Sequence, residues 1–481
     1  MIWIKHFLLD FYKKILILNF QKENYLEMKK LLYIFPLFLG GFLFSQDLKK
    51  DSLQFKKISD EILVNGKSYE DLRELTKNIG NRLCGSANYE KAADWAMEKL
   101  KEAGADKVWF QPVVVNVWSR GDESLKIKIN SGKWKEVRML SLGNSEGTKG
   151  KNLKGEIILV KTLEEFEKIP DILIKDKIVF FNYAFKQEYV VTGQAYGDAG
   201  KYRRVTAAEV AKKGGKAVII RSLTSNFDDV PHTGAMRYED GIQKIPAIAI
   251  GAETANELEK TLLKKEKVEA ILNSNCGMNG EALTKSVIAE ITGNKDKSVI
   301  VVGGHLDSWD VGEGAHDDGT GIVQSIEVLR TFKKLNLNNN HTIRVICYAN
   351  EENGVRGGRT YLESLKKSNE PHIFALESDS GGFTPRSFTL GMSPEKAKEM
   401  KKWEKLFNPY GIFEFAGDYS GVDIEPLREL KIPTSELVTD SQRYFDIHHT
   451  PEDTFEKVNR RELLLGATVM TQLIYMIDQN W

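Results

Sequence analysis

Five stretches of this chain bring histidine and carboxylate side chains together. They are His305-Leu306-Asp307, the Asp317-Asp318 pair, the Glu351-Glu352 pair, Asp379 and the His448-His449 pair. Imidazole and carboxylate ligands without thiolates suit Zn²⁺, Mn²⁺ or Co²⁺ at a catalytic site. Two such ions about 3.5–4 Å apart need about five protein ligands, one of them shared. We therefore predict a centre for a pair of metal ions, with ligands from His305, Asp317, Glu352, Asp379 and His449.

Two further acidic residues fit tasks around such a centre. Asp307 follows His305 by two positions, where a carboxylate can hold the imidazole by its other nitrogen. Of the adjacent Glu351 and Glu352, one can bind metal while the other acts as a general base. Each short motif alone is weak, because adjacent acids often only complement a helix N-terminus. The prediction rests on all five stretches following one another at the ends of elements.

The elements around these residues alternate between strands and helices. Strands are predicted at 298–303, 343–349 and 373–377, and helices at 321–335 and 358–365. Near-continuous apolar strands between amphipathic helices predict an α/β fold with a mostly parallel sheet, covered by helices on both faces. In such sheets ligands bind beyond the carboxyl ends of the strands, which is where the acids and histidines fall.

The first half of the chain has a different texture. Residues 68–104 read as helical, with a stop at Gly104. Between about 113 and 275, short β-rich runs at 156–160, 177–181, 217–220 and 246–250 alternate with helical stretches at 205–213 and 252–264. This pattern predicts a separate α/β module of about 150 residues.

Composition excludes several classes of protein. The 481 residues carry 68 Lys+Arg and 68 Asp+Glu, which argues against a nucleic-acid-binding surface. The three cysteines, Cys84, Cys276 and Cys347, form no CxxC motif and no disulfide framework. Cys347 lies in an apolar strand and is expected to be a buried free thiol. A bridge between Cys84 and Cys276 stays open.

The N-terminal region resembles a targeting segment. The apolar run 31–44 follows Lys29-Lys30 and precedes Ser45-Gln46, which is typical of a secretory signal peptide. At about 1.5 Å per residue it is too short for a bilayer core of about 30 Å. We predict translation from Met28, cleavage near Ser45, a secreted or periplasmic protein, and no stable membrane anchor.

The ordered motifs resemble the M28 family of metallopeptidases. Supporting stretches are Gly304–Asp310, Asp317–Gly321, Glu351–Gly354, Glu377–Asp379, Tyr444–Thr454, Arg82 with Gly85-Ser86, and, outside the catalytic part, Arg221-Ser222, Pro231–Gly234 and Lys244–Pro246. The resemblance implies a zinc-exopeptidase-type sheet with an inserted protease-associated α/β domain. The expected organisation is 1–45 upstream segment and signal, 46–115 and 286–481 catalytic domain, and 116–285 insertion.

The resemblance also implies roles for single residues. His305 and Asp379 would bind one Zn²⁺, Glu352 and His449 the other, and Asp317 would bridge them through a site with a cis Asp317-Asp318 bond. Asp307 would orient His305, and Glu351 would be the general base for attack by a hydroxide held at the two metals. The implied substrate is a small unblocked peptide, most of all a dipeptide, and the implied assembly is a homodimer.

Substrate recognition is less constrained by the sequence. A dipeptide carboxylate needs an Arg, a His or backbone N–H donors; Arg221 and His232 of the insertion are available, and Glu377 can face the ammonium. One alternative is an aminopeptidase acting on longer peptides with the same metals. Another is a non-catalytic receptor-type or peptide-binding protein of the same fold, although such relatives typically lack the metal ligands.

Overall fold

The computed structural model describes residues 49–481, so the predicted signal peptide and the start at Met28 lie outside the described residues. Residues 58–481 form one compact unit, and 49–57 belong to a separate N-terminal unit. The larger unit is built on two eight-stranded sheets. Within the described residues, no helix is both long enough and apolar enough to span a bilayer.

The first sheet carries the residues predicted to bind metal. Its strands lie in the order β1-β10-β12-β11-β13-β16-β14-β15. Their bounds are β1 Lys107–Ser119, β10 Gly277–Ile291, β11 Val299–His305, β12 Thr342–Tyr348, β13 His372–Glu377, β14 Pro385–Phe388, β15 Glu414–Phe415 and β16 Thr434–Thr439. The central strands β12, β11, β13 and β16 are parallel, and β1, β10 and β14 pair antiparallel. The fully buried central strands explain their near-continuous apolar sequences.

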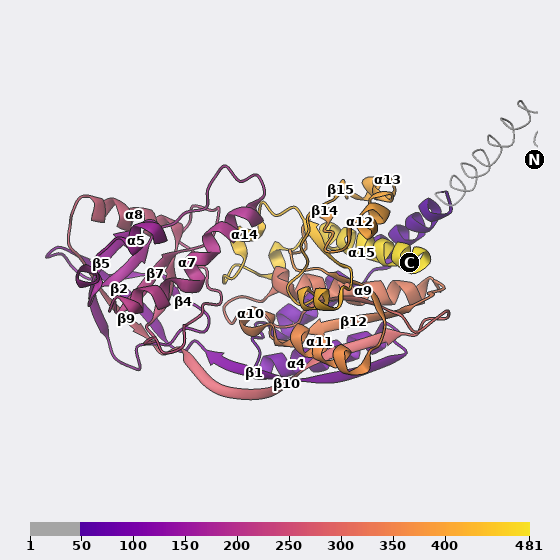
Figure 1. Cartoon of the computed structure of the whole chain (residues 1–481), viewed down its shortest axis with the longest axis horizontal. Helices are drawn as coiled ribbons and strands as arrows, with labels where there is room; N and C mark the ends of the chain where they lie inside the picture. The colour runs from indigo at the N-terminus through magenta and orange to yellow at the C-terminus, as the bar shows by residue number, and fades with distance from the viewer. Residues whose placement is uncertain (1–48) are drawn as a thin grey trace, which may run out of the picture. The chain divides into compact units, whose positions relative to one another are not determined.

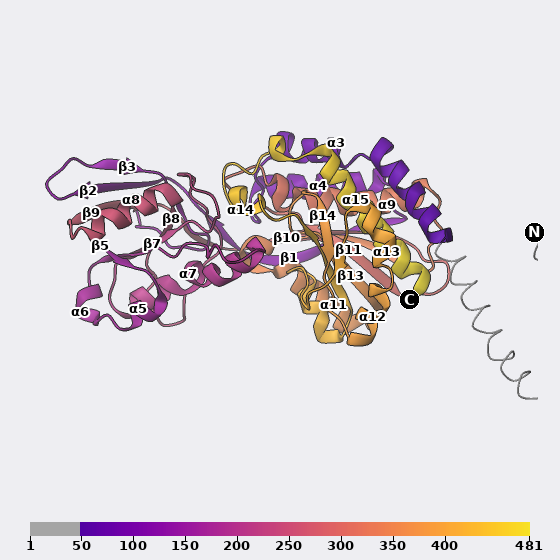
Figure 2. The same cartoon turned by 90° about the horizontal axis from the view of Figure 1, so that it is seen from above.

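Helices cover both faces of this sheet, as predicted. The longer ones are α3 Ser68–Glu74, α4 Ala87–Glu102, α9 Thr320–Lys334, α11 Arg356–Ser368, α12 Pro394–Lys401 and α15 Arg460–Asn480. Figure 2 shows α3, α4, α9 and α15 on one side of the central strands and α11 on the other. On α9, Ile322, Ile326 and Leu329 form the buried stripe that its sequence predicted. The α/β architecture is therefore confirmed.

The second sheet is formed by the chain between β1 and β10. Its order is β3-β2-β9-β5-β6-β7-β8-β4, with β5, β6, β7 and β8 parallel. The strands are β2 Glu123–Ile129, β3 Lys135–Val137, β4 Met139–Ser141, β5 Leu153–Val160, β6 Ile178–Phe181, β7 Ala217–Arg221, β8 Ala247–Ile250 and β9 Val268–Ser274. Four helices lie around this sheet: α5 Leu163–Glu167, α7 Thr192–Lys212 and α8 Ala252–Leu263, labelled in Figure 1, and α6 Asp171–Ile174, labelled in Figure 2.

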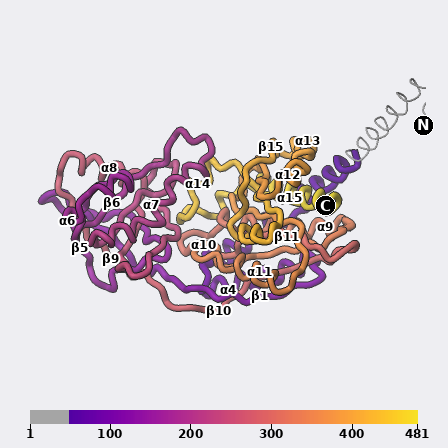
Figure 3. The backbone as a smooth tube through the Cα atoms, viewed as in Figure 1, coloured from indigo at the N-terminus to yellow at the C-terminus, as the bar shows by residue number. Residues whose placement is uncertain are grey.

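The paired strands β1 and β10 lead to this second sheet and back, as the tube in Figure 3 traces. Sequence reasoning missed both strands. The predicted boundaries at 115/116 and 285/286 fall inside them. The helix α7 also begins at Thr192, well before the predicted 205. The N-terminal half of α7 (residues 192–201) consists mostly of small and polar residues. It therefore has too few apolar positions to show a helical period in the sequence.

The predicted helix over 68–104 is wrong in its middle. Helix α3 runs through a short π-helix, Leu75–Ile79, into a loop, and α4 begins at Ala87 with Ser86 as its N-cap. Gly80 and Gly85 adopt φ values of +78° and +89°, which end the helical path. The break has a structural role, because it places the buried Arg82 where its guanidinium donates to the carbonyls of three later residues (Leu306, Glu313 and Gly314).

Candidate metal centre

Parallel pairing brings the predicted ligands to one edge of the first sheet. His305 ends β11 and pairs with Tyr348 at the end of β12, just before Glu351 and Glu352. Gly303 pairs with Glu377 at the end of β13, two residues before Asp379. Because parallel strands end on the same side, these side chains meet beyond the carboxyl ends, where α/β sheets bind ligands.

One half of the centre forms around His305. Its Nε2 atom lies 3.2 Å from Asp317 Oδ1 and 3.3 Å from Asp379 Oδ1. The ring's other nitrogen, Nδ1, lies 3.0 Å from the main-chain carbonyl of Asp307, whereas the Asp307 carboxylate is 3.8 Å away. The side of the ring that faces the carboxylates is thus fixed by a residue two positions along the chain.

The other half forms around His449, which lies in the loop after the short helix α14 (Tyr444–Ile447). Its Nε2 atom lies 3.3 Å from Asp317 Oδ2 and 3.2 Å from Glu352 Oε2. Asp317 therefore faces His305 with one carboxylate oxygen and His449 with the other. All five predicted ligands are brought together, with Asp317 in the middle.

The backbone of Asp317 is fixed by a neighbouring acid. Asp453 accepts hydrogen bonds from the amides of His316 (2.8 Å) and Asp317 (3.1 Å). The Asp317-Asp318 peptide bond is cis, as the resemblance implied. Asp318 has a carboxylate oxygen within 4.8 Å of ligand atoms of His305 and Asp379, and it accepts from the amides of His305 and Gly321. Sequence reasoning gave no task to Asp318, whose carboxylate ties β11 to the start of α9.

The five side chains fit a metal by their separations. Around a tetrahedral zinc with bonds of about 2.0–2.1 Å, neighbouring ligand atoms lie about 3.3 Å apart. The four nitrogen–oxygen separations on either side of Asp317 are 3.2–3.3 Å. Asp317 Oδ2 is also buried and receives no hydrogen bond. Buried polar atoms are normally satisfied, so this oxygen lacks the partner that a cation would provide.

The pKa shifts of the buried ligands also fit a bound cation. Burial raises the pKa of Glu352 well above its ordinary value, and Asp317 and Glu351 add to the effect. For Asp317, burial also acts to raise the pKa, but the nearby imidazoles of His305 and His449 prevail and hold its pKa well below the usual range. Burial lowers the pKa of His449, which favours the neutral imidazole that a metal requires. Such buried carboxylates are stabilised as anions by a bound cation.

The general-base candidate, Glu351, is placed by Asp307. The Asp307 carboxylate accepts from the amides of Glu351 (3.0 Å) and Glu352 (3.3 Å), at the start of the short helix α10 (Glu351–Gly354). Burial raises the pKa of Glu351 well above its ordinary value. Asp307 thus connects the His305 loop to both glutamates through its carboxylate, a task that the HxD spacing alone did not predict.

Other candidates from the sequence lie elsewhere or have other partners. Arg221 donates to the side chains of Asn182 and Asn256, within the region of the second sheet. Glu377 is fully buried and accepts from the amides of Asp423 and Ile424, so it does not present a free carboxylate. His232 is buried, and neither ring nitrogen has a hydrogen-bond partner.

Two residues beside His449, Arg203 and His448, were given no role of their own by the sequence. Arg203, on α7, places Nη1 3.4 Å from His449 Nδ1 and donates through Nη2 to the Tyr196 hydroxyl. His448 stacks on His449 with ring centroids 3.5 Å apart, and its Nε2 lies 3.6 Å from Asp317 Oδ2. No local motif announces Arg203, because the contact joins residues 246 positions apart.

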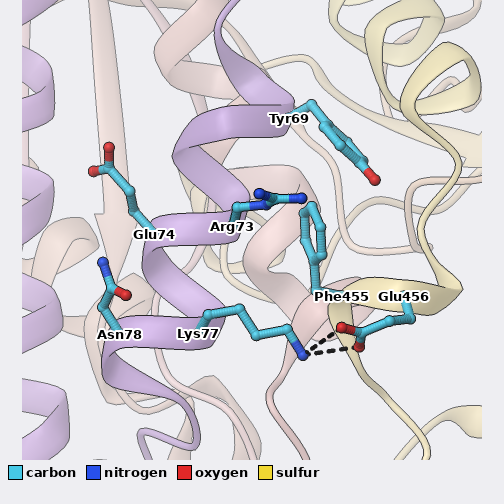
Figure 4. Close-up of a pocket in the computed structure, with 7 residues that line it drawn as sticks. All are labelled: Tyr69, Arg73, Glu74, Lys77, Asn78, Phe455 and Glu456. Carbon is cyan, nitrogen blue, oxygen red and sulfur yellow. Dashed lines mark hydrogen bonds and ion pairs between the residues drawn. The ribbon is translucent and has the colours of Figure 1, made fainter.

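The pocket with the most room among those described below does not contain the predicted metal ligands. A pocket of about 620 Å³, drawn in Figure 4, is lined by Tyr69, Arg73, Glu74, Lys77, Asn78, Phe455 and Glu456. Lys77 there pairs with Glu456 and Glu313, and none of the predicted metal ligands lines the pocket. A much smaller cavity does reach the centre, through Asp317, Glu352 and His449, with Trp309 in its wall. The candidate site is therefore defined by its side chains and not by the 620 Å³ pocket.

Comparison with known proteins agrees with the fold. Residues 286–474 match peptidase family M28. Carboxypeptidase Q of Xenopus laevis is 33% identical over 438 residues, which are 89% of this chain and 91% of that protein. The crystal structure of a peptidase M28 precursor from Shewanella amazonensis SB2B has a TM-score of 0.84 and 31% identity, and covers 90% of this chain and 97% of that one. A zinc aminopeptidase from Bacillus subtilis (TM-score 0.61, 20% identity, 85% and 94% coverage) shares the fold.

Sheet, site and relatives together define a metallo-exopeptidase. The chain belongs to peptidase family M28 and is similar to carboxypeptidase Q over nearly its whole length. The resemblance inferred from the sequence motifs is thereby confirmed, and the non-catalytic alternative loses its basis.

Proposed function

We propose that this chain is an exported dizinc exopeptidase that hydrolyses small unblocked peptides, most of all dipeptides. The observation that carries the metal part is the symmetrical placement of Asp317, with one oxygen 3.2 Å from His305 Nε2 and the other 3.3 Å from His449 Nε2. His305 and Asp379 would hold one zinc, His449 and Glu352 the other, and Asp317 both. A bound zinc pair supplies an activated water near neutral pH and polarises the scissile carbonyl.

The protein's own contribution to the reaction centres on Glu351. Its carboxylate takes the proton of the attacking water and later delivers it to the leaving amine nitrogen. A carboxyl whose pKa is raised by burial holds that proton more readily between the two transfers. Asp307 fixes the backbone of Glu351, and its carbonyl fixes the ring of His305, so one residue aligns the base with the metal ligands.

We assign recognition of the substrate carboxylate to Arg203 instead of Arg221 or His232. Arg203 is 7% exposed, its Nε atom has no hydrogen-bond partner, and its neighbours are Tyr196, Thr233 and His449. Among the described residues no carboxylate is paired with it. A buried guanidinium without an anion is unfavourable, and the C-terminal carboxylate of a dipeptide would supply one beside the metal centre.

Replacement of Arg203 tests this assignment. Arg203→Met should lower kcat/KM for a dipeptide about 10–100-fold, the usual value of a charge-assisted hydrogen bond, and leave zinc content unchanged. The C-terminal amide of the same dipeptide should be cleaved slowly and equally by both proteins. Arg221→Met is the matched control, because Arg221 is also buried with an unpartnered Nε atom, but its Nη1 atom donates to two asparagines and not to a neighbour of the metal centre. An equal loss on the amide would contradict carboxylate recognition.

The competing function is an aminopeptidase acting on longer peptides. Similarity to a zinc aminopeptidase fold keeps this candidate in view. A free amino-terminus would then suffice, so C-blocked peptides would be cleaved as well as free ones. Comparison of free, N-blocked and C-blocked peptides separates the two functions.

The domain organisation and export belong to the same proposal. We propose a catalytic domain from 46–115 and 286–481 and a protease-associated insertion at 116–285, supported by the separate second sheet. Export through residues 31–44 would leave a mature N-terminus near Ser45 or Gln46, which N-terminal sequencing of the native protein would detect. An intact Met1 would overturn it. A homodimer is expected from the resemblance, and sedimentation equilibrium measures it.

A further inference from the structure

The imidazole of His449 is held from behind by a distant part of the chain. Its Nδ1 atom lies 3.3 Å from the main-chain carbonyl of Thr233, 216 positions earlier in the sequence. The Thr233 amide in turn donates to the main-chain carbonyl of His449 at 3.0 Å. The main chain of Thr233 therefore contacts both the ring and the backbone of His449. His449 has a φ of +61°, which is uncommon for a residue other than glycine.

The residue after Thr233 packs closely against His449 and Arg203. Residue 234 is a glycine with φ +125°, and a Cβ atom there would lie 2.6 Å from His449 Nδ1 and 2.3 Å from Arg203 Nη1. Ordinary Cβ contacts are longer than 3.0 Å. Any side chain at position 234 would consequently displace the His449 ring or the arginine beside it.

Thr233 is anchored in its turn. Its hydroxyl donates to the carbonyl of Ser141 (2.8 Å) and accepts from Arg120 (3.3 Å). Arg120 also donates to both carboxylate oxygens of Asp310, at 2.9 and 2.7 Å. Asp310 lies in the loop that follows His305. The segment is thus tied to the first sheet's loops as well as to the second sheet.

We propose that the segment 231–234 is a positioning element of the metal centre, which fixes the His449 ring so that its Nε2 atom faces Asp317 and Glu352. The inference rests on the proposed zinc pair. Metal-ligating histidines generally need their second ring nitrogen hydrogen-bonded, and loss of such a partner typically costs 10–100-fold in metal affinity. The zinc site of His449 and Glu352 depends on this segment, and the site of His305 and Asp379 does not.

The coupling is reciprocal. If the 231–234 segment strengthens zinc binding at His449, zinc binding strengthens the contact of that segment with the His449 loop by the same factor. The region between β1 and β10 therefore takes part in forming the metal centre. It supplies the outer contact of one metal ligand, while the other half of the centre is oriented by its own loop.

The test uses Gly234→Ala and measures binding of Zn²⁺ alone to the metal-free full chain by chelator competition. Gly241→Ala is the matched control, because Gly241 also has a positive φ (+81°) but nothing within 4 Å of its Cβ position. We expect two sites in the wild type and in Gly241→Ala. In Gly234→Ala one site should weaken 10–100-fold while the other keeps its affinity.

Background variants identify which site is affected. With Asp379→Ala the remaining site is that of His449, and adding Gly234→Ala should weaken it 10–100-fold. With Glu352→Ala the remaining site is that of His305, and adding Gly234→Ala should leave it unchanged. Equal loss at both sites would overturn the proposal. So would retention of two wild-type sites in Gly234→Ala.

A second variant tests the proposal if Gly234→Ala fails to fold. If Gly234→Ala loses its circular dichroism spectrum, Thr233→Val decides, because it keeps the carbonyl but removes the hydroxyl that anchors the segment to Ser141 and Arg120. A several-fold weaker site at His449 supports the proposal, and unchanged affinity overturns it. A wild-type chain that binds fewer than two zinc ions would instead overturn the proposed function, so the two failures are distinguishable.

Discussion

The two halves of the metal centre are held in different ways. His305 ends a buried parallel strand, and its ring is oriented by the carbonyl of Asp307, two residues away. His449 lies in a loop with a left-handed backbone, and its ring is oriented by Thr233 from another region of the chain. One half is specified by local sequence and the other by tertiary structure. A site can therefore be symmetrical in its ligands and asymmetrical in what positions them.

The largest expected effect comes from removing the proposed general base, which belongs to neither half of the ligand set. Glu351→Ala should lower kcat by about 10²–10⁴-fold, the usual contribution of a general base, because it removes the carboxylate proposed to accept the proton. Zinc content should stay near that of the wild type in both halves. Steady-state kinetics with metal analysis on the same sample checks this, and near-wild-type turnover would reject the role of Glu351.

Loss of the shared ligand should erase the difference between the halves. Asp317→Ala removes both carboxylate oxygens that face His305 and His449. We expect weaker zinc at both sites and loss of activity that added zinc restores only in part. Equilibrium dialysis gives the stoichiometry. Full occupancy at wild-type affinity would contradict the bridging role.

A local change should show how far the His305 half depends on its own loop. Asp307→Ala removes the carboxylate that holds the amides of Glu351 and Glu352 but keeps the carbonyl that holds the His305 ring. Activity should fall about 10–100-fold, with the His305 site keeping its zinc. If that site loses zinc first, the carboxylate and not the carbonyl orients the ring.

The smallest expected effect concerns the loop that inserts Arg82 beneath the His305 half. A Cβ at Gly85, where φ is +89°, would lie 2.7 Å from Val117 Cγ2, whereas Gly280, with φ +91°, has open space around it. Gly85→Ala should cost about 2–4 kcal/mol of unfolding free energy, from overpacking added to backbone strain. Gly280→Ala should cost about 1 kcal/mol. Urea denaturation compares them, and equal losses would show that the Val117 contact is unimportant.

The same contrast explains what could be predicted from the sequence. The strands that end at His305 and Glu377 were predictable, because fully buried parallel strands have continuous apolar runs between amphipathic helices. Their carboxyl ends then place His305, Glu352 and Asp379 together by topology alone. Asp317 and His449 were predicted as ligands from their residue types and their order in the chain, because both lie in loops that the strand pattern does not place. Their roles at the two metals came from the family resemblance.

Features that depend on distant contacts were not predictable. Gly80 and Gly85 break the expected 68–104 helix because Arg82 must reach carbonyls more than two hundred positions later. The long strands β1 and β10 pair only with partners distant in sequence. Arg203 belongs to no motif, and Thr233 was noted only within the stretch 231–234 of the family resemblance, without a role. Their places beside His449 emerge only in the folded chain.

Crystals of the full chain soaked in zinc and measured at the zinc absorption edge would locate the bound ions. We expect two anomalous peaks flanking Asp317, one contacting His305 and Asp379 and the other contacting His449 and Glu352. A single peak, or zinc bound by Asp318 or His448 in place of Asp317 and His449, would contradict this expectation.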